Sequence, residues 1–209
     1  PAIHPRFILR LRNTGLPIVL VDNTLNETPV DCVLCDNEGG AYQAVKHLIQ
    51  HDHQRIVFLS GPAEWLSSRE RAAGYRRALE EAGLAPHIVF MPNTVAETGR
   101  QAMLTALEKY PDLTAVMAVN DATAVGAIQA CRGVGRAVPD DVAVIGFDDE
   151  PWAQIHTPPL TTVHIYWHEI GIQAARRVVD LIERPHLTPM RISLATELVI
   201  RRSCGCSKG

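Results

Sequence analysis

The sequence predicts an α/β protein built on parallel β-sheets that carry helices on both faces. Short apolar runs alternate with segments of helical periodicity along most of the 209 residues, and this order is typical of repeated strand–helix–strand units. The apolar runs are nearly unbroken, as expected for parallel strands that are covered on both sides. With 46% hydrophobic residues, the chain can bury the core that such a fold needs.

Each element follows from its local pattern. Strands are expected at short runs of apolar or β-branched residues, namely 17–22, 30–34, 55–61, 87–91, 114–119, 142–147, 160–165 and 191–200. Between most of these runs, apolar residues recur three and four positions apart, which predicts helices. The helical patterns cover 41–49, 72–82, a segment around 104–107 that stops at Pro111, 125–128 and 170–181.

Composition excludes several classes of protein. No apolar run is long enough to cross a bilayer, so a membrane is not expected as a partner. The net charge is −3 and the 20 Lys and Arg residues are scattered, so this chain by itself should bind nucleic acid poorly. Five cysteines, an odd number, argue against a disulfide framework and favour a reducing compartment, for which the cytoplasm is the expectation.

The cysteine spacings raise the question of a metal site. Cys32 and Cys35 form a CxxC, but they lie on a predicted strand where residues three apart point to opposite faces. Cys204 and Cys206 form a CxC that we expect in a frayed tail. We therefore expect small core residues and no metal site or cofactor.

Polar residues stand where several predicted strands end, and ligands of open α/β sheets bind at these carboxyl ends. They are Asp22, Ser60, Asn120 with Asp121, and Asp148 with Asp149. Asp121 and Asp149 are expected to cap helices. Asn120 and Asp148 come one residue earlier, at the strand tip, where contact with a ligand is the better expectation because amide and carboxylate groups suit paired hydroxyls or N–H groups.

A loop and helix start at 66–79 add Ser67, Ser68, Arg69 and Arg71. Arginine is unusual in the first turn of a helix because the helix dipole disfavours a cation there. Two interpretations stay open: Arg71 reaches a ligand cleft, or it lies on a solvated face with Arg76 and Arg77.

Signatures of catalysis are missing from the sequence, and we expect no catalytic residue. The segment "GVGRAV" (133–138) lacks the third glycine of a dinucleotide loop and leads into a strand. There is no phosphate loop, GxSxG elbow or HExxH helix. Asp148 and Asp149 are adjacent at a strand end, where their side chains should diverge, so they are not expected to form a catalytic pair.

Four longer segments stand out together: "DNEGGAYQAVKHLIQHDHQRIVFLSGP" (36–62), "SSRERAAGYRRALEEAGL" (67–84), "AVMAVNDATAVGAIQACRGVGRAVPDDVAVIGFDD" (115–149) and "PPLTTVH" (158–164). In their order and spacing they resemble the effector-binding region of the LacI/GalR family of bacterial transcription regulators. The resemblance implies a type I periplasmic-binding-protein-like fold, with two doubly wound parallel-sheet subdomains, crossover hinges and an effector held between the subdomains.

By this resemblance, residues 1–30 are a remnant of the first subdomain and 31–160 form the second. Residues 161–185 are then a crossover and helix that return to the first subdomain, and 186–209 are the final crossover, strand and tail. The family's DNA-binding helix-turn-helix and the first elements of its effector region have no counterpart here, so the first subdomain is expected to be incomplete.

The resemblance also assigns the effector site. Ser67, Arg71, Asn120, Asp148 and Trp167 match positions at which family members contact the effector, and Asp22 is a further candidate from the other subdomain. A family position that is often aromatic corresponds to Thr94, so one wall of a stacking pocket is expected to be missing. Asp52 stands where the family usually has glycine, which predicts a strained left-handed turn.

The function predicted from these observations is that of an effector sensor rather than an enzyme. A sugar or related metabolite would bind between the subdomains, and a homodimer would transmit the change to operator DNA through a DNA-binding domain absent from this sequence, as a repressor or an activator. Two alternatives are a periplasmic sugar-binding protein of a transporter and a doubly wound enzyme acting on sugars or nucleotides.

Overall fold

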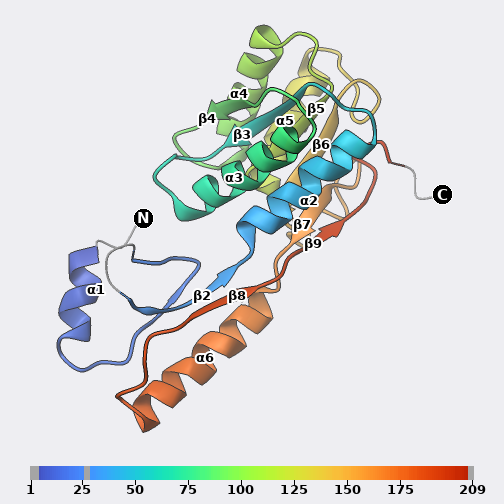
Figure 1. Ribbon diagram of the computed structural model, residues 1–209. Coiled ribbons are helices and arrows are strands. Elements are labelled where there is room, and N and C mark those ends of the chain that lie inside the picture. Colours follow the sequence, from blue (N-terminus) through green and yellow to red (C-terminus); the bar gives the residue numbers. More distant parts are fainter. Residues whose placement is uncertain (1–4, 26–28, 207–209) are drawn as a thin grey trace. The chain divides into compact units, whose positions relative to one another are not determined.

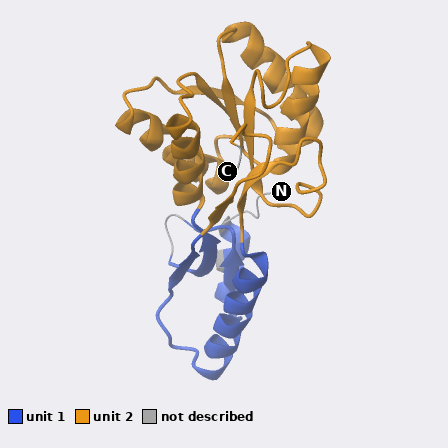
Figure 2. Cartoon of the chain, turned by 90° about the vertical axis from the view of Figure 1, so that its right-hand side faces the viewer, with its two compact units in different colours: residues 1–36, 166–195 blue, residues 37–165, 196–209 orange. Residues whose placement is uncertain are grey.

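The computed structural model describes residues 5–25 and 29–206, and it divides into two compact units (Figure 2). Unit 1 contains residues 1–36 and 166–195, and unit 2 contains residues 37–165 and 196–209. The chain therefore passes between the units three times, at 36/37, 165/166 and 195/196. Within 5–25 and 29–206, no helix is both long enough and apolar enough to cross a membrane.

Unit 2 is built on a six-stranded sheet in the order β4-β3-β5-β6-β7-β9 (Figure 1). Its strands pair in parallel except for the edge strand β9, which is antiparallel to β7. The central strands are buried along their whole length, as their unbroken apolar runs predict. The bounds are β3 (Ile56–Ser60), β4 (His87–Phe90), β5 (Ala115–Ala118), β6 (Ala143–Asp148), β7 (Thr161–His164) and β9 (Glu197–Val199).

Helices flank this sheet on both faces (Figure 2). They are α2 (Asn37–Gln50), α3 (Leu66–Glu81), α4 (Ala96–Lys109) and α5 (Asp121–Gly133). Helix α2 packs against α3, and α4 packs against α5. Each pair has a glycine at its crossing: a Cβ on Gly74 would lie 2.0 Å from the carbonyl oxygen of Glu38, and one on Gly126 would lie 1.9 Å from that of Ala96. The close packing of both pairs therefore depends on the absence of these side chains.

Unit 1 holds a parallel three-stranded sheet in the order β1-β2-β8. Its elements are α1 (Pro5–Arg12), β1 (Val19–Val21), β2 (Asp31–Cys35), α6 (Trp167–Glu183) and β8 (Arg191–Leu194). Helix α6 packs against β1 and β2. Only β2, the central strand, is buried along its whole length.

The sequence-based boundaries differ from the observed units at each crossing. Residues 31–35 were expected in the second subdomain, but β2 hydrogen-bonds to β1 and β8 and belongs to unit 1. Residues 161–165 stay in unit 2, because β7 pairs with β6. The single strand expected at 191–200 is two strands, β8 in unit 1 and β9 in unit 2. The pattern of apolar residues is the same whichever sheet a strand joins, so it does not predict where the chain leaves one sheet for the other.

Candidate functional site

The carboxyl ends of β3, β5 and β6 form one edge of the unit 2 sheet, because these neighbouring strands are parallel. Four of the predicted residues follow these ends: Ser67 in the first turn of α3, Arg71 one turn later, Asn120 after β5 and Asp148 as the last residue of β6. Hydrogen bonds connect Arg71 with Asp148 and with the carbonyl of Val119, which precedes Asn120. We call this set of residues the carboxyl-edge site.

Arg71 is the centre of the carboxyl-edge site. Its side chain is only 6% exposed, and each nitrogen donates to a different group. Nε donates to Asn37 Oδ1 (2.8 Å), one terminal nitrogen to the Val119 carbonyl, and the other to Asp148 Oδ1 (3.2 Å). The guanidinium also lies over the Phe147 ring, 3.7 Å from its centroid. The alternative that placed Arg71 on a solvated face is therefore wrong, although Arg76 and Arg77 do lie on one.

The two adjacent carboxylates diverge, as expected. Asp148 has a φ of 103° and Asp149 a φ of 54°, so both residues adopt a backbone conformation that favours glycine. Asp148 accepts from Arg71, whereas Asp149 accepts from Arg201 (2.7 Å) and interacts with His164 Nδ1 (2.9 Å). This turn aims one carboxylate at the carboxyl-edge site and keeps the other in a separate ion-pair network.

The assignment of helix caps was wrong. Asn120, not Asp121, caps α5: its Oδ1 accepts from the backbone N–H of Thr123 (2.9 Å), while its Nδ2 donates to the Thr94 carbonyl (3.1 Å). Asp149 caps no α-helix, because a series of turns follows it. Asn120 has extended backbone angles, which is the conformation of a helix cap. Its role as an effector contact stays a prediction.

Asp121 is fully buried below this edge. Its Oδ1 accepts from the Thr162 hydroxyl and its Oδ2 from the backbone N–H of Glu150 (2.8 Å). Burial raises the pKa of Asp121 to about 7. The negative charges of Asp148 and Asp149 raise it further, whereas the two hydrogen bonds lower it. A Cβ on Gly146 would lie 2.2 Å from Asp121 Oδ1, so glycine is required at that position.

Two buried hydroxyl groups lie at the same edge without a hydrogen-bond partner among residues 5–25 and 29–206. They belong to Ser60, at the end of β3, and Ser68, in the first turn of α3. The Ser68 hydroxyl lies next to Gly61, which in turn lies next to Thr94. Buried hydroxyls normally have a partner, so unused hydrogen-bonding capacity is concentrated here.

Sequence reasoning missed two residues of this site and the behaviour of the tail. Asn37, the first residue of α2, orients Arg71, and Phe147 provides the surface under it. Both lie far from Arg71 in the sequence, and local sequence pattern does not predict that they contact it. The tail is not frayed at Ser203 and Cys204: both are buried, and the Ser203 hydroxyl donates to the Val144 carbonyl (2.6 Å).

The remaining predicted residues, Asp22 and Trp167, lie in unit 1. Asp22 follows β1 with a φ of 52°, and Trp167 is the first residue of α6 with 44% of its surface exposed. Their roles as effector contacts stay predictions. Asp52 adopts the left-handed conformation expected from its position, with a φ of 64°.

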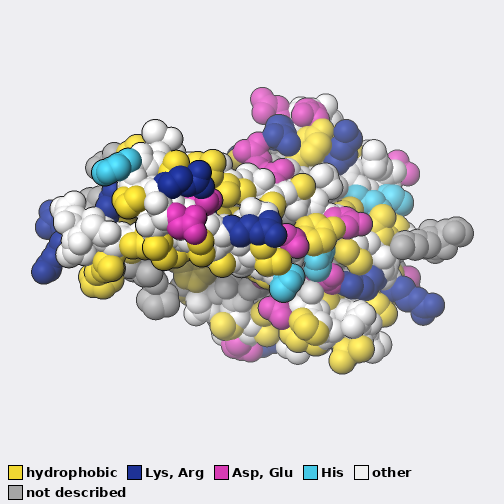
Figure 3. All heavy atoms as spheres, turned by 90° about the horizontal axis from the view of Figure 1, so that it is seen from below, with side chains coloured by type: hydrophobic (Ala, Val, Ile, Leu, Met, Phe, Trp, Pro, Cys, Tyr) yellow, Lys and Arg dark blue, Asp and Glu magenta, His cyan; other side chains and the backbone are white. Residues whose placement is uncertain are grey.

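Charge is distributed in small groups of both signs on the face shown in Figure 3, without a broad basic patch. This agrees with the net charge of −3. A cluster of potential metal ligands, His47, His51 and Cys206, lies away from the carboxyl-edge site.

Comparison with known proteins supplies the family. Residues 45–204 match the model of the periplasmic binding protein-like domain. The chain is 36% identical over 197 residues to the HTH-type transcriptional regulator CelR of Thermobifida fusca, covering 92% of this chain and 58% of the relative. It is 34% identical to a probable HTH-type transcriptional repressor, ExuR, of Bacillus subtilis, covering 96% and 61%. The chain thus spans about three fifths of the length of these curated relatives.

Solved structures agree with this result. The complex of the transcriptional regulator CelR with cellobiose superimposes with a TM-score of 0.88 at 36% identity, covering 92% of this chain and 60% of that one. A LacI family regulator from Enterococcus faecium with bound ribose has a TM-score of 0.88 at 25% identity, covering 97% and 76%. These relatives are transcriptional regulators rather than enzymes. The chain belongs to the LacI family of transcriptional regulators and corresponds to their periplasmic-binding-protein-like effector region.

Proposed function

We propose that this chain senses a neutral, hydroxyl-rich metabolite, most simply a sugar, and that the carboxyl-edge site of unit 2 supplies its central polar contacts. The observation that carries the proposal is the Arg71–Asp148 pair, which is held in place from three sides at the sheet edge where two buried hydroxyls have no partner among the described residues. Relatives with bound cellobiose and ribose support this ligand class.

The charge of the site favours a neutral ligand over an anion. Arg71 is paired with Asp148, so its positive charge is already balanced. A phosphate would have to compete with Asp148 for the guanidinium, whereas a sugar hydroxyl can donate to the carboxylate without displacing the arginine. The buried Phe147 ring supports the guanidinium from beneath.

In the proposed regulator, the effector shifts a conformational balance by binding one state more tightly than another. We propose that the change reaches operator DNA through a helix-turn-helix outside these residues, in a homodimer that works in the cytoplasm. Ser67, Asn120, Asp22 and Trp167 are proposed as further effector contacts.

A thermal-shift screen followed by calorimetry tests this function. The panel contains cellobiose, ribose, other mono- and disaccharides, sugar phosphates and purine bases. A ligand at about 100 times its dissociation constant should stabilise the chain by about 2.7 kcal/mol. We expect a neutral sugar to give the largest shift; a sugar phosphate or purine as the tightest ligand would contradict the assigned class.

Any hit should then be measured on Asp148→Asn. Asparagine is better tolerated than alanine at the positive φ of this position; it removes the charge and replaces one acceptor oxygen with an NH2 group. The loss of charge-assisted hydrogen bonds should weaken binding by about 1–2 kcal/mol. Asp112→Asn is the matched control, because Asp112 is an exposed residue of unit 2 paired only with Arg55 on the surface. Equal affinities of the two variants would refute the role of Asp148.

A further inference from the structure

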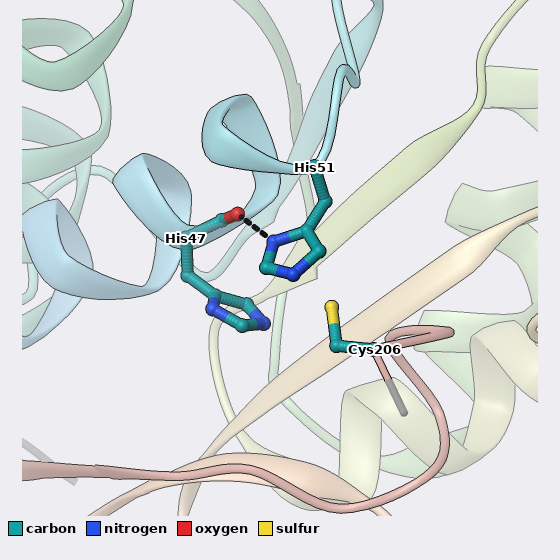
Figure 4. Close-up of side chains that lie close together, drawn as sticks. All are labelled: His47, His51 and Cys206. Atoms are coloured by element: carbon teal, nitrogen blue, oxygen red, sulfur yellow. Dashed lines mark hydrogen bonds between the residues drawn. The ribbon is translucent and has the colours of Figure 1, made fainter. Parts of the chain in front are cut away.

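A second group of chemically active side chains lies at the opposite edge of the unit 2 sheet. Helix α2 ends at Gln50 and leads into the start of β3, so its last turn lies at the amino ends of the strands. His47 and His51 stand one helical turn apart there, and Cys206 approaches them from the C-terminal segment (Figure 4). One ligand atom from each of these residues lies within 4.8 Å of the other two.

The hydrogen bond of His51 leaves its other nitrogen ready to bind a metal. Nδ1 of His51 lies 2.8 Å from the backbone carbonyl oxygen of His47. A carbonyl oxygen only accepts, so Nδ1 carries the hydrogen and Nε2 carries the lone pair of the neutral ring. In metal sites, a bond of this kind from the distal nitrogen to a carbonyl orients the ligating histidine.

His47 supplies an independent indication of a ligand. The residue is only 8% exposed, and within residues 5–25 and 29–206 its Nε2 makes no hydrogen bond of ordinary geometry, although the Cys204 side chain interacts with the ring. Leaving a buried ring nitrogen unpaired is costly, and a bound ion would remove that cost. The sulfur of Cys206 faces the two rings in Figure 4.

A fourth donor is adjacent. Cys204 is buried and its side chain interacts with that of His47, and Cys206 Sγ lies 3.4 Å from the backbone oxygen of Cys204. The set combines a CxC with two histidines four residues apart. Two thiolates and two neutral imidazoles balance the charge of a divalent ion, and this set of nitrogen and sulfur donors suits zinc in tetrahedral geometry.

We propose that His47, His51, Cys204 and Cys206 form a zinc site that fastens the end of α2 to the C-terminal segment of unit 2. Zinc–nitrogen and zinc–sulfur bonds of about 2.0 and about 2.3 Å place donor atoms roughly 3.3–3.8 Å apart, so the three clustered donors need to move inward by about 1 Å. An open groove of about 1100 Å³, lined by His51, Cys204 and Cys206 among others, provides a path for the ion.

Zinc binding to the whole chain tests this site without reference to effector binding. Reduced, metal-free protein is titrated with zinc in competition with a chromophoric chelator, and separately with cobalt, whose bonds to thiolates give charge-transfer absorption. We expect one ion per chain and a thiolate band with cobalt. Cys206→Ser and His51→Ala should each weaken zinc binding by at least about a hundredfold.

His53→Ala is the matched control. His53 neighbours the cluster, but its Nδ1 interacts with the Thr114 hydroxyl (3.0 Å) and it is not one of the four ligands. The zinc affinity of His53→Ala should equal that of the unmodified chain. His51 is exposed and Cys206 is half-buried, so both variants should fold, and circular dichroism of the metal-free proteins checks this.

The site would be disproved by the absence of stoichiometric zinc binding, by a cobalt spectrum without a thiolate band, or by Cys206→Ser and His51→Ala binding zinc as well as His53→Ala does. Because the readout is metal affinity, failure of the effector screen would leave this result unaffected.

Discussion

Both units contain a buried Arg–Asp pair, and the two pairs differ in what surrounds them. In unit 1, Arg177 of α6 donates through Nε to Asp31 Oδ1 (2.6 Å) and through a terminal nitrogen to the Thr188 carbonyl (2.7 Å). The same carboxylate oxygen accepts from the Met190 N–H (3.0 Å), and both side chains are 7% exposed. In unit 2, Arg71 is equally buried, but the side chain of Asp148 is 21% exposed.

The difference separates a structural ion pair from a binding pair. Asp31 connects α6, β2 and the segment before β8, and it faces protein on all sides. The side chain of Asp148 is partly exposed and lies on a strained turn, at the sheet edge where two buried hydroxyls have no partner in the described chain. The same two residue types therefore stabilise one unit and equip the other for a ligand.

Replacing Arg177 of the buried unit 1 pair should have the largest effect on stability. Arg177→Met leaves Asp31 as a buried carboxylate without its cation, which should lower the free energy of unfolding by about 3–5 kcal/mol. Urea denaturation measures this loss. Arg184→Met is the control: Arg184 is an exposed arginine at the end of the same helix, and its replacement should change stability by less than about 0.5 kcal/mol. Similar losses in both variants would show that burial of the pair is unimportant.

Asp121 extends the comparison to a buried carboxyl without an arginine. Its pKa is raised to about 7 in the folded chain, so the folded state holds a proton that the unfolded state releases near pH 4. The resulting stability is complete at low pH and is lost as the pH rises through about 7. Between about pH 5 and about pH 8 this loss should amount to roughly 2–3 kcal/mol.

Urea denaturation of the chain and of Asp121→Asn across this pH range isolates the effect. Asparagine can donate to Thr162 and accept from the N–H of Glu150, but it does not titrate. We expect the variant to have the flatter dependence on pH. Parallel curves for the two proteins would mean that Asp121 is ionised throughout.

Replacing Arg71 of the unit 2 pair should affect effector binding more than stability. Arg71→Lys keeps the charge but loses the divided donation to Asn37, Val119 and Asp148 and the flat contact with Phe147. Effector affinity should fall by about 1–3 kcal/mol, measured by calorimetry. Arg77→Lys, at an exposed position of the same helix, should bind like the unmodified chain. If Arg71→Lys destabilises the fold as strongly as Arg177→Met, the two pairs have the same structural role.

Local sequence pattern predicted most elements of the fold and their order, but it did not predict α1 and it merged β8 with β9. Unbroken apolar runs such as 55–61 and 114–119 form strands that are covered on both faces. A strand covered on both faces needs apolar residues at successive positions, and this can be seen in the sequence. The same logic predicted that polar residues after the strands would meet at one edge; Asp148 pairs with Arg71 there, whereas Asp22 lies in unit 1.

Only the tertiary structure decided which of these polar groups do what. Asn120 caps a helix, Asp149 serves another network, and Asn37 orients an arginine 34 positions away in sequence. It also brought His47 and His51 to Cys206, about 160 residues apart in sequence. Hydrogen bonds and ligand sets depend on distances of a few ångströms between segments, and these distances arise only when the helices and the tail pack on the sheet, whereas periodicity depends on near neighbours alone.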